Sequence, residues 1–312
     1  MKIGIDAMGG DFAPEAIVEG VVMAAPDLPQ NAQIILIGKQ ETISALLKKN
    51  QYEGSQILIV HADEVVEMGE HPTKALSQKP HSSIAIGFKL LKEKEIDIFC
   101  GAGNTGAMHV GALFSIRAIE GVIRPAIVGI VPQTKGTNSI MLDIGANADC
   151  KPEVLEQFGL IGSIFAQHTF GIDRPRVALM NIGEEEQKGS VAAQAAHQLL
   201  KDNTRINFIG NMEGNDMFDD KADVIVTDGF TGNALFKLAE SFYDLAKKRG
   251  IQDDIIDKMN YEAIGGSSIV GVNGNVMIAH GISTPVAIRN MVTWARKQVE
   301  TQAYVQIAKA LS

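Results

Sequence analysis

Five apolar, strand-like segments are each followed by a loop that combines glycine with aspartate, asparagine or threonine. Glycine lets backbone N–H groups approach a ligand closely, and the small polar side chains can bind or orient an anion. For any single loop, an ordinary strand-to-helix turn explains these residue types as well. Several such loops after parallel strands would meet at one sheet edge, where α/β proteins bind their ligands. The loops at 6–11, 101–106, 143–149, 181–184 and 228–233 are therefore our candidate site.

The loop at 101–106 reads GAGNTG and matches the G-x-G-x-x-G pattern of nucleotide-binding turns. A dinucleotide site also needs an acidic residue after the next strand, but the segment Ala126–Val131 is followed by Pro-Gln-Thr. We therefore interpret the loop as a phosphate cradle at a helix N-terminus and not as an NAD site. Ser82 and Ser83 begin another helix, either as its N-cap or as an anion site. The phosphate-binding candidates are Ser82, Ser83, Gly103, Asn104, Thr105 and Gly106.

Two further polar residues have open interpretations. Lys188 lies in GEEEQKGS, which resembles a Walker A loop with its Lys and Gly transposed, so an ATPase is rejected. Lys188 either contacts a phosphate or oxyanion or is a solvated surface lysine. His280 follows a late strand and is either an acid/base group or a hydrogen-bonded core histidine.

Signatures of a nucleophilic or metal-dependent enzyme are missing from the sequence. No G-x-S-x-G elbow occurs, and the 7 histidines show no metal-ligand spacing. Cys100 ends a strand, where a small buried residue is the better interpretation than a nucleophile. We expect no metal and no cofactor.

Short Ile/Val-rich segments alternate with helical segments along the chain, which predicts an α/β/α sandwich with a mostly parallel sheet. The expected strands are Lys2–Asp6, Gln33–Ile37, Gln56–Val60, Ile96–Cys100, Ala126–Val131, Ser139–Asp143, Arg176–Asn181, Asn207–Gly210, Asp223–Thr227, Ser268–Val272 and Val276–Ala279. The expected helices are Pro14–Ala25, Glu41–Asn50, Ser82–Glu93, Thr105–Ile119, Glu153–His168, Ser190–Asp202, Thr231–Lys248 and Pro285–Ala310.

Composition narrows the class of protein. The chain has 312 residues, 46% of them hydrophobic, and we treat residues 1–312 as one domain. Its 28 Lys and Arg against 37 Asp and Glu give a net charge of −9, which argues against nucleic acid as a partner. Two cysteines and no signal-peptide pattern indicate a reducing cytoplasm. The helix 231–248 has an apolar stripe typical of core or of a dimer surface; the alternative is a membrane-lying or partner-binding helix.

The polar loops occur in an order that closely resembles the bacterial PlsX-type phosphate acyltransferases, from residue 1 to about residue 310. The matching motifs are DAMGGD at 6–11, GAGNTGA at 101–107, LDIGAN at 142–147, NIGEE at 181–185 with KG at 188–189, FIGN at 208–211 with Glu213, TDGFTGN at 227–233, GG at 265–266 and HG at 280–281.

This resemblance implies transfer of an acyl group from acyl–acyl carrier protein to inorganic phosphate, in phospholipid and fatty acid metabolism. It implies a fold like that of isocitrate/isopropylmalate dehydrogenases and phosphotransacetylases, and a homodimer that works beside the membrane and supplies a downstream membrane acyltransferase. The reaction needs no covalent enzyme intermediate, because phosphate is itself a nucleophile and a thiolate leaves readily. We expect catalytic roles for Lys188, Asn233, His280 and Asp228, and loop-organising roles for Asp6, Gly9, Gly10, Asp11, Asp143 and Asn147.

The chain departs from that family pattern in two places. The segment 234–264 is shorter than the helical insert of many members, so we expect a shortened protruding element, and membrane contact does not carry over directly. Cys100 stands where the family more often has alanine or another small residue. Three other classes stay open: a phosphotransacetylase-like enzyme that uses acyl-CoA, an NAD-dependent decarboxylating dehydrogenase, and a non-catalytic scaffold. Candidate docking patches for the acidic carrier protein are Lys89, Lys92 and Lys94; Arg117 with Arg124; and 247–249.

Overall fold

The computed structural model describes residues 1–311 and divides into two compact units. Unit 1 comprises residues 1–118 and 261–300. Unit 2 comprises residues 119–260 and the segment that begins at Thr301. Each unit contains its own set of neighbouring strands and flanking helices. The treatment of the chain as one domain stays a prediction.

The strands of unit 1 are parallel except for the last in the row. Their spatial order is β3-β2-β1-β4-β11-β10, and only β10 runs antiparallel to its neighbour β11. Parallel strands with both faces covered are expected to be almost entirely apolar, which is what the sequence shows. The bounds are β1 Lys2–Asp6, β2 Gln33–Gly38, β3 Ile57–His61, β4 Ile98–Gly101, β10 Ser267–Val270 and β11 Asn275–Ile278.

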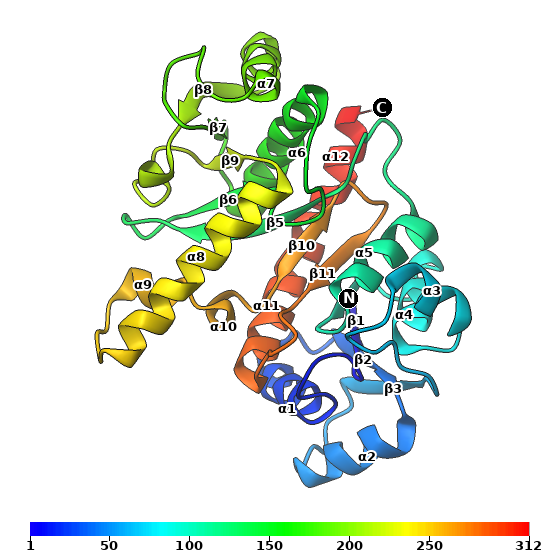
Figure 1. Ribbon diagram of the computed structural model, residues 1–312. Coiled ribbons are helices and arrows are strands. Elements are labelled where there is room, and N and C mark those ends of the chain that lie inside the picture. Colours follow the sequence, from blue (N-terminus) through cyan, green and yellow to red (C-terminus); the bar gives the residue numbers. More distant parts are fainter. Residues whose placement is uncertain (312) are drawn as a thin grey trace. The chain divides into compact units, whose positions relative to one another are not determined.

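Helices cover both faces of the unit 1 strands (Figure 1). Ile3 and Ile5 of β1 are buried in a cluster with the helices α1 (Glu15–Ala24), α2 (Gln40–Lys49) and α11 (Pro285–Thr301). Side chains alternate along a strand, so Phe99 of β4 faces the other way. There it packs edge-on against Phe88 of α4 (Ser83–Lys92), with ring centroids 5.0 Å apart.

Unit 2 contains a second set of mostly parallel strands. Their order is β5-β6-β9-β7-β8, and only β5 runs antiparallel to its neighbour β6. The loops after β6, β7, β8 and β9 therefore leave from one edge of these strands. The bounds are β5 Ala126–Pro132, β6 Asn138–Leu142, β7 Arg176–Met180, β8 Asn207–Met212 and β9 Val224–Val226.

The strands of unit 2 also carry helices on both faces. A Cβ at Gly162 of α6 (Pro152–Phe170) would lie 2.9 Å from a methyl group of Leu142, so Leu142 faces α6. Gly129 pairs with Met141, the residue before Leu142, and therefore points to the opposite face. The Phe236 ring of α8 (Gly229–Lys248) lies over Gly129 on that face. The α/β/α prediction is thus confirmed in both units.

Each expected strand is present and ends within two residues of its predicted limits. Two expected helices were wrong in extent. The segment 105–119 forms α5 (Thr105–Gly111) and then one wider turn, Ala112–Ile116, which stops at Arg117 with φ of 65°. The segment 285–310 breaks after α11 at Gln302 (φ 49°), where α12 (Ala303–Leu311) begins.

Several short helices were not expected, since none is long enough to show an apolar period in the sequence. They are α3 (Pro72–Gln78), α9 (Asp254–Lys258), α10 (Tyr261–Ile264) and the single turns Ala25–Asp27 and Gly214–Asp216. The helix α7 (Val191–Asp202) of unit 2, in contrast, was expected.

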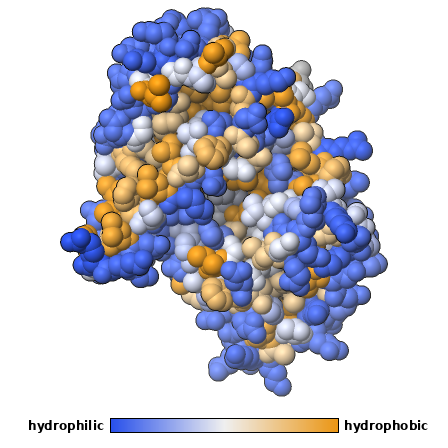
Figure 2. All heavy atoms as spheres, viewed as in Figure 1, coloured by the Kyte–Doolittle hydropathy of each residue, from blue (hydrophilic) through white to orange (hydrophobic). Residues whose placement is uncertain are grey.

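The apolar stripe of α8 is not core. Leu238, Phe242 and Leu245 are 53%, 46% and 55% exposed, so the interpretation of this stripe as core is wrong for these side chains. Figure 2 shows apolar side chains gathered along this helix. Among the described residues, no helix combines the length and the apolar character needed to cross a membrane.

Candidate active site

In unit 1, three loops that leave neighbouring parallel strands meet at one edge. The backbone N–H of Asp11, after β1, donates to the carbonyl oxygen of Gly281, after β11, at 2.8 Å. The backbone N–H of Ala279 donates to the carbonyl oxygen of Gly101 at the end of β4, at 2.9 Å. The loops after β1, β4 and β11 are therefore fixed to one another by backbone contacts.

Glycine is required where the first two of these loops touch. A Cβ at Gly9 would lie 2.7 Å from the Cα of Gly103, and a Cβ at Gly103 would lie 3.1 Å from the Cα of Gly9. Gly10 has a φ of 116°, which side-chain-bearing residues rarely adopt. These glycines let two backbones approach closely, as the sequence expectation for the loop at 6–11 requires.

Asp6 is buried beneath these loops. Its carboxylate accepts a hydrogen bond from the backbone N–H of Met8 at 2.9 Å. Burial raises the pKa of the Asp6 carboxyl, and the opposing contributions come from the Ser83 hydroxyl and the N–H groups of Met8 and Gly9. Buried carboxyl groups with a raised pKa are common at functional sites. Asp6 therefore supports this edge as the candidate site.

We expect stability to depend on pH through Asp6. Because the pKa of Asp6 is higher in the folded chain, the folded state binds more protons above the ordinary aspartate pKa, and stability falls as the pH rises through the folded pKa. An Asp6→Asn variant should lack this contribution. Urea unfolding of both proteins from pH 4 to pH 8 should therefore show the wild type losing stability relative to Asp6→Asn as the pH rises. A constant difference across this range would contradict the assignment.

Asn104 forms the N-cap of α5 and anchors a neighbouring loop. Its Oδ1 accepts from the backbone N–H of Ala107 at 2.9 Å. Its Nδ2 donates to the carbonyl oxygens of Glu67, Met68 and Glu70 at 3.2, 3.1 and 2.9 Å. Both polar atoms of the side chain are engaged within the chain. Of the predicted phosphate contacts on this turn, the backbone N–H groups of Thr105 and Gly106 take no part in these bonds.

The loop that Asn104 anchors is also held by Lys79. The Lys79 ammonium donates to Glu70 Oε2 at 2.6 Å and to the carbonyl oxygen of Val65 at 2.7 Å. The ion pair lowers the pKa of Glu70. This anchoring role of Lys79 was not expected from the sequence, since nothing in the local pattern connects positions 70 and 79.

The two serine candidates differ in their contacts. Ser82 is the N-cap of α4: its Oγ accepts from the N–H of Ala85 at 3.3 Å and donates to the carbonyl oxygen of Lys79 at 2.8 Å. The Ser83 Oγ is buried and makes no hydrogen bond of normal geometry. Ser83 lies close enough to Asp6 to affect its pKa, so the structure brings Ser83 and Asp6 together.

His280 lies at the exit of β11, half-buried. Its ring packs against that of Tyr261 with centroids 5.3 Å apart, and its carbonyl oxygen accepts from Ser283 Oγ at 2.6 Å. The Tyr261 hydroxyl donates to the carbonyl oxygen of Ile282 at 3.2 Å. Tyr261 thus supports the loop that carries His280, and sequence reasoning did not identify it.

In unit 2, a buried carboxylate organises the loop after β6. Asp143 Oδ1 accepts from the backbone N–H groups of Ile127, Gly145 and Ala146 at 3.0 to 3.1 Å. Its Oδ2 accepts from the backbone N–H of Asn147 at 2.6 Å and from Asn147 Nδ2 at 2.9 Å. With its acceptor positions filled by N–H groups, Asp143 holds the loop and has little capacity left for a ligand.

The exit of β9 packs directly on that loop. Asp228 is the N-cap of α8 and accepts from the backbone N–H and the hydroxyl of Thr231 at 2.8 and 3.0 Å. Asn233 Nδ2 donates to the carbonyl oxygen of Ile144 at 3.2 Å. A Cβ at Gly232 would lie 2.0 Å from the carbonyl oxygen of Asp143, so only glycine fits there. The structure therefore brings Asp143, Asp228 and Asn233 together.

Lys188 lies on the loop after β7, on the same strand edge as the other unit 2 candidates. Its side chain is exposed, and its carbonyl oxygen accepts from Asn181 Nδ2 at 3.1 Å. The loop positions a free cation at the strand exits, which suits contact with an anionic group.

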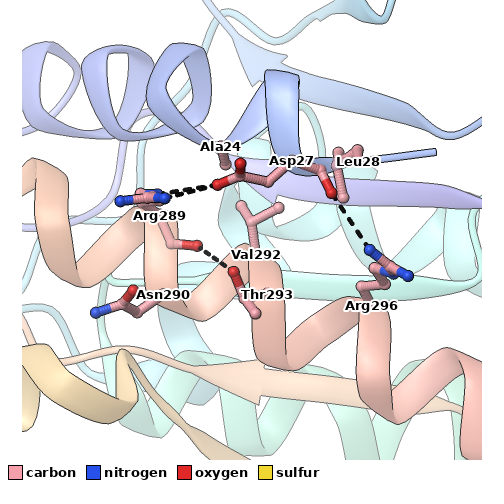
Figure 3. Close-up of a pocket in the computed structure, with 8 residues that line it drawn as sticks. All are labelled: Ala24, Asp27, Leu28, Arg289, Asn290, Val292, Thr293 and Arg296. Carbon is pink, nitrogen blue, oxygen red and sulfur yellow. Dashed lines mark hydrogen bonds and ion pairs between the residues drawn. The ribbon is translucent and has the colours of Figure 1, made fainter. Parts of the chain in front are cut away.

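A cavity of about 400 Å³ lies elsewhere in unit 1, between α11 and the turn after α1 (Figure 3). Its two guanidinium groups are already engaged: Arg289 donates to Asp27 Oδ2 at 2.7 and 3.2 Å, and Arg296 donates to the Asp27 carbonyl oxygen at 3.2 Å. Asp27 follows α1, so this cavity is at the edge opposite to the exit of β1. It is not part of the candidate site.

Comparison with known proteins agrees with the motif pattern. A family model described as "Fatty acid synthesis protein" matches residues 1–306. Curated proteins named "Phosphate acyltransferase" are similar over nearly their whole length: the protein of Dictyoglomus turgidum is 43% identical over 331 residues (100% of this chain, 98% of that protein). That of Acetivibrio thermocellus is 43% identical over 326 residues (98% and 95%).

Solved structures show the same fold at low sequence identity. A phosphotransacetylase from Streptococcus pyogenes superimposes with a TM-score of 0.68 at 17% identity, covering 96% of this chain and 94% of that one. A branched-chain phosphotransacylase from Enterococcus faecalis gives a TM-score of 0.65 at 16% identity, covering 96% and 99%. The expected likeness to phosphotransacetylases is therefore confirmed at the level of the fold.

Proposed function

This chain belongs to the fatty acid synthesis protein family, and on that premise we propose that it is an acyltransferase that forms acyl phosphate from acyl–acyl carrier protein and inorganic phosphate. The observation that carries the proposal is the cluster of strand-exit loops in unit 1. There the close-packed Gly9 and Gly103 fix two loops against each other, and the N–H groups of Thr105 and Gly106 and the Ser83 hydroxyl are donors suited to a small anion.

The state of the two cysteines supports transfer without a covalent enzyme intermediate. Burial raises the pKa of the Cys100 thiol, and burial together with Asp143 and Asp228 raises that of Cys150 to about 12. Both thiols are therefore protonated at neutral pH, and the thiolate is the nucleophilic form. A phosphate oxygen would attack the thioester carbonyl carbon, and the C–S bond would break as the carrier's thiolate leaves.

The residues divide by what they can offer to this reaction. The N–H groups of Thr105 and Gly106 and the Ser83 hydroxyl would hold phosphate, while Asn104 positions the turn and Ser82, whose hydroxyl already donates to the Lys79 carbonyl oxygen, caps α4. Lys188 and Asn233 are candidates for contact with the tetrahedral oxyanion, His280 for proton transfer to the thiolate, and Asp228 for orienting its helix N-terminus. Asp143 and Asp228 already accept hydrogen bonds from N–H groups of the chain, and their charge would repel phosphate.

The partners and location follow from the same proposal. The acidic carrier protein needs a local basic patch. Lys89, Lys92 and Lys94 are exposed at the end of α4, which leads into the start of β4, so they lie at the edge opposite to the unit 1 loops. That placement disfavours them. Arg117 lies at the same edge, because its carbonyl oxygen accepts from the backbone N–H of Asn273 just before β11 begins, so Arg124 and 247–249 remain as candidate patches. The proposal also includes that the chain forms a homodimer in the cytoplasm, contacts the membrane peripherally and supplies a downstream membrane acyltransferase.

The test is thiol release from palmitoyl–acyl carrier protein with and without inorganic phosphate, with acyl phosphate trapped by hydroxylamine. Phosphate-dependent release and a trapped hydroxamate are expected. Turnover of palmitoyl-CoA but not of the carrier-protein thioester would indicate that the substrate is acyl-CoA. Reduction of a nicotinamide cofactor in the presence of a divalent metal would indicate a decarboxylating dehydrogenase. Binding of carrier protein without turnover would indicate a non-catalytic scaffold.

A further inference from the structure

The loop that carries Lys188 is fastened at both ends by one asparagine. Asn181, directly after β7, donates from Nδ2 to the carbonyl oxygen of Lys188 at 3.1 Å, and its Oδ1 accepts from the backbone N–H of Ile182 at 2.9 Å. Gly189 has a φ of 90°, and a Cβ there would lie 2.3 Å from Asn181 Oδ1. The two ends of the loop are thus closed on Asn181.

The middle of this loop is held from β8 by Asn211. Asn211 is 4% exposed, and its Nδ2 donates to the carbonyl oxygen of Glu185 at 2.9 Å. Its Oδ1 lies 2.9 Å from His197 Nδ1. Because the amide nitrogen of Asn211 is the donor to Glu185, its oxygen must be an acceptor, so His197 Nδ1 carries the hydrogen.

His197, on α7, is itself fixed by its surroundings. It is 4% exposed, and its ring packs edge-on against Phe208 of β8 with centroids 5.1 Å apart. Its Nε2 lies 3.9 Å from Glu186 Oε1, and Glu186 also pairs with Lys201 at 2.5 Å. A continuous chain of contacts therefore runs from α7 through His197 and Asn211 to the backbone of the loop.

We propose that His197 and Asn211 are positioning residues that hold the Lys188 loop in its reactive conformation. The inference rests on the proposed function, because it assumes that Lys188 acts on an anionic group of the reaction. Neither residue needs to touch a substrate: the buried imidazole orients the amide, and the amide fixes the carbonyl three residues before Lys188. Without this support, the Lys188 ammonium would move away from its position in the reaction, and turnover would fall.

The activity test is a double-mutant cycle with a conservative rescue. His197→Leu should lower kcat/KM about 10-fold, and His197→Asn, whose amide can replace the Nδ1–H donor, should restore most of it. In a Lys188→Ala background, His197→Leu should have almost no further effect, since both act through one group. His168→Leu, on α6, is the control for loss of a histidine. Additive losses, or no rescue by asparagine, would overturn the proposal.

Trypsin provides a second readout that does not depend on activity. Cleavage after Lys188, followed by the mass of the two fragments, should be at least 10-fold faster in Asn211→Leu and His197→Leu than in the wild type and in His168→Leu. Unchanged cleavage would show that these residues do not hold the loop and would overturn the proposal. If Lys188→Ala keeps full activity while cleavage after Lys188 accelerates in Asn211→Leu and His197→Leu, Lys188 has no role in the proposed reaction. That result overturns the reactive role of the loop and leaves only its anchoring.

Discussion

An Asn104→Ala variant is expected to lose about 99% of its phosphate-dependent turnover while staying folded, a roughly 100-fold effect of the size that small misplacements of a binding group produce. Alanine removes the N-cap of α5 and frees the carbonyl oxygens of Glu67, Met68 and Glu70. The turn that presents the N–H groups of Thr105 and Gly106 would then lose its anchor. Cap loss costs about 1 kcal/mol, a minor share of the stability of a domain.

Initial rates at varied phosphate, with circular dichroism of each variant, separate these effects. We expect the KM for phosphate to rise and the far-UV spectrum to be unchanged. Asp253→Ala is the matched control, because Asp253 caps α9 through the backbone N–H groups of Ile255 and Ile256 at 2.9 and 3.1 Å and belongs to none of the candidate loops. Normal turnover by Asn104→Ala would remove this turn from the site.

The strands could be predicted closely because burial on both faces leaves an unbroken apolar run that local sequence records. Ala126–Pro132 is buried along its whole length, for example, and was expected to within one residue. Helix breaks could not be predicted in the same way. The apolar period continues through Gln302, and only a positive φ at that residue divides α11 from α12. Neither glycine nor proline marks the position.

The candidate site was predicted in its loops but not in its supports. Polar residues after strands are visible in the sequence, since the edge of a parallel sheet gathers them. The groups that hold those loops lie far along the chain: Asn104 binds carbonyls 34 to 37 residues earlier, and His197 reaches Asn211 across 14 residues. Such contacts leave no periodic signal, so Lys79, Tyr261 and His197 were found only in the structure.

The largest loss of stability is expected for Asp143→Ala, about 3–5 kcal/mol in the free energy of unfolding. Removing the carboxylate leaves the backbone N–H groups of Ile127 and Asn147 buried without their acceptor and also removes the part-buried bond to the N–H of Gly145. Each unsatisfied buried donor costs about 1–3 kcal/mol, and water entering the vacated space recovers part of the sum. Urea unfolding monitored by circular dichroism measures the loss through the midpoint and slope.

Asp143→Asn and Asp219→Ala make the test specific to the acceptor role. Asparagine keeps an oxygen at the Oδ1 position for Ile127 and Gly145 but places N–H groups against the Asn147 donors, so about half of the loss is expected. Asp219 is exposed, and its removal should change stability by less than about 0.5 kcal/mol. Equal losses for alanine and asparagine would mean that the charge, and not the count of accepted hydrogen bonds, is what the loop after β6 requires.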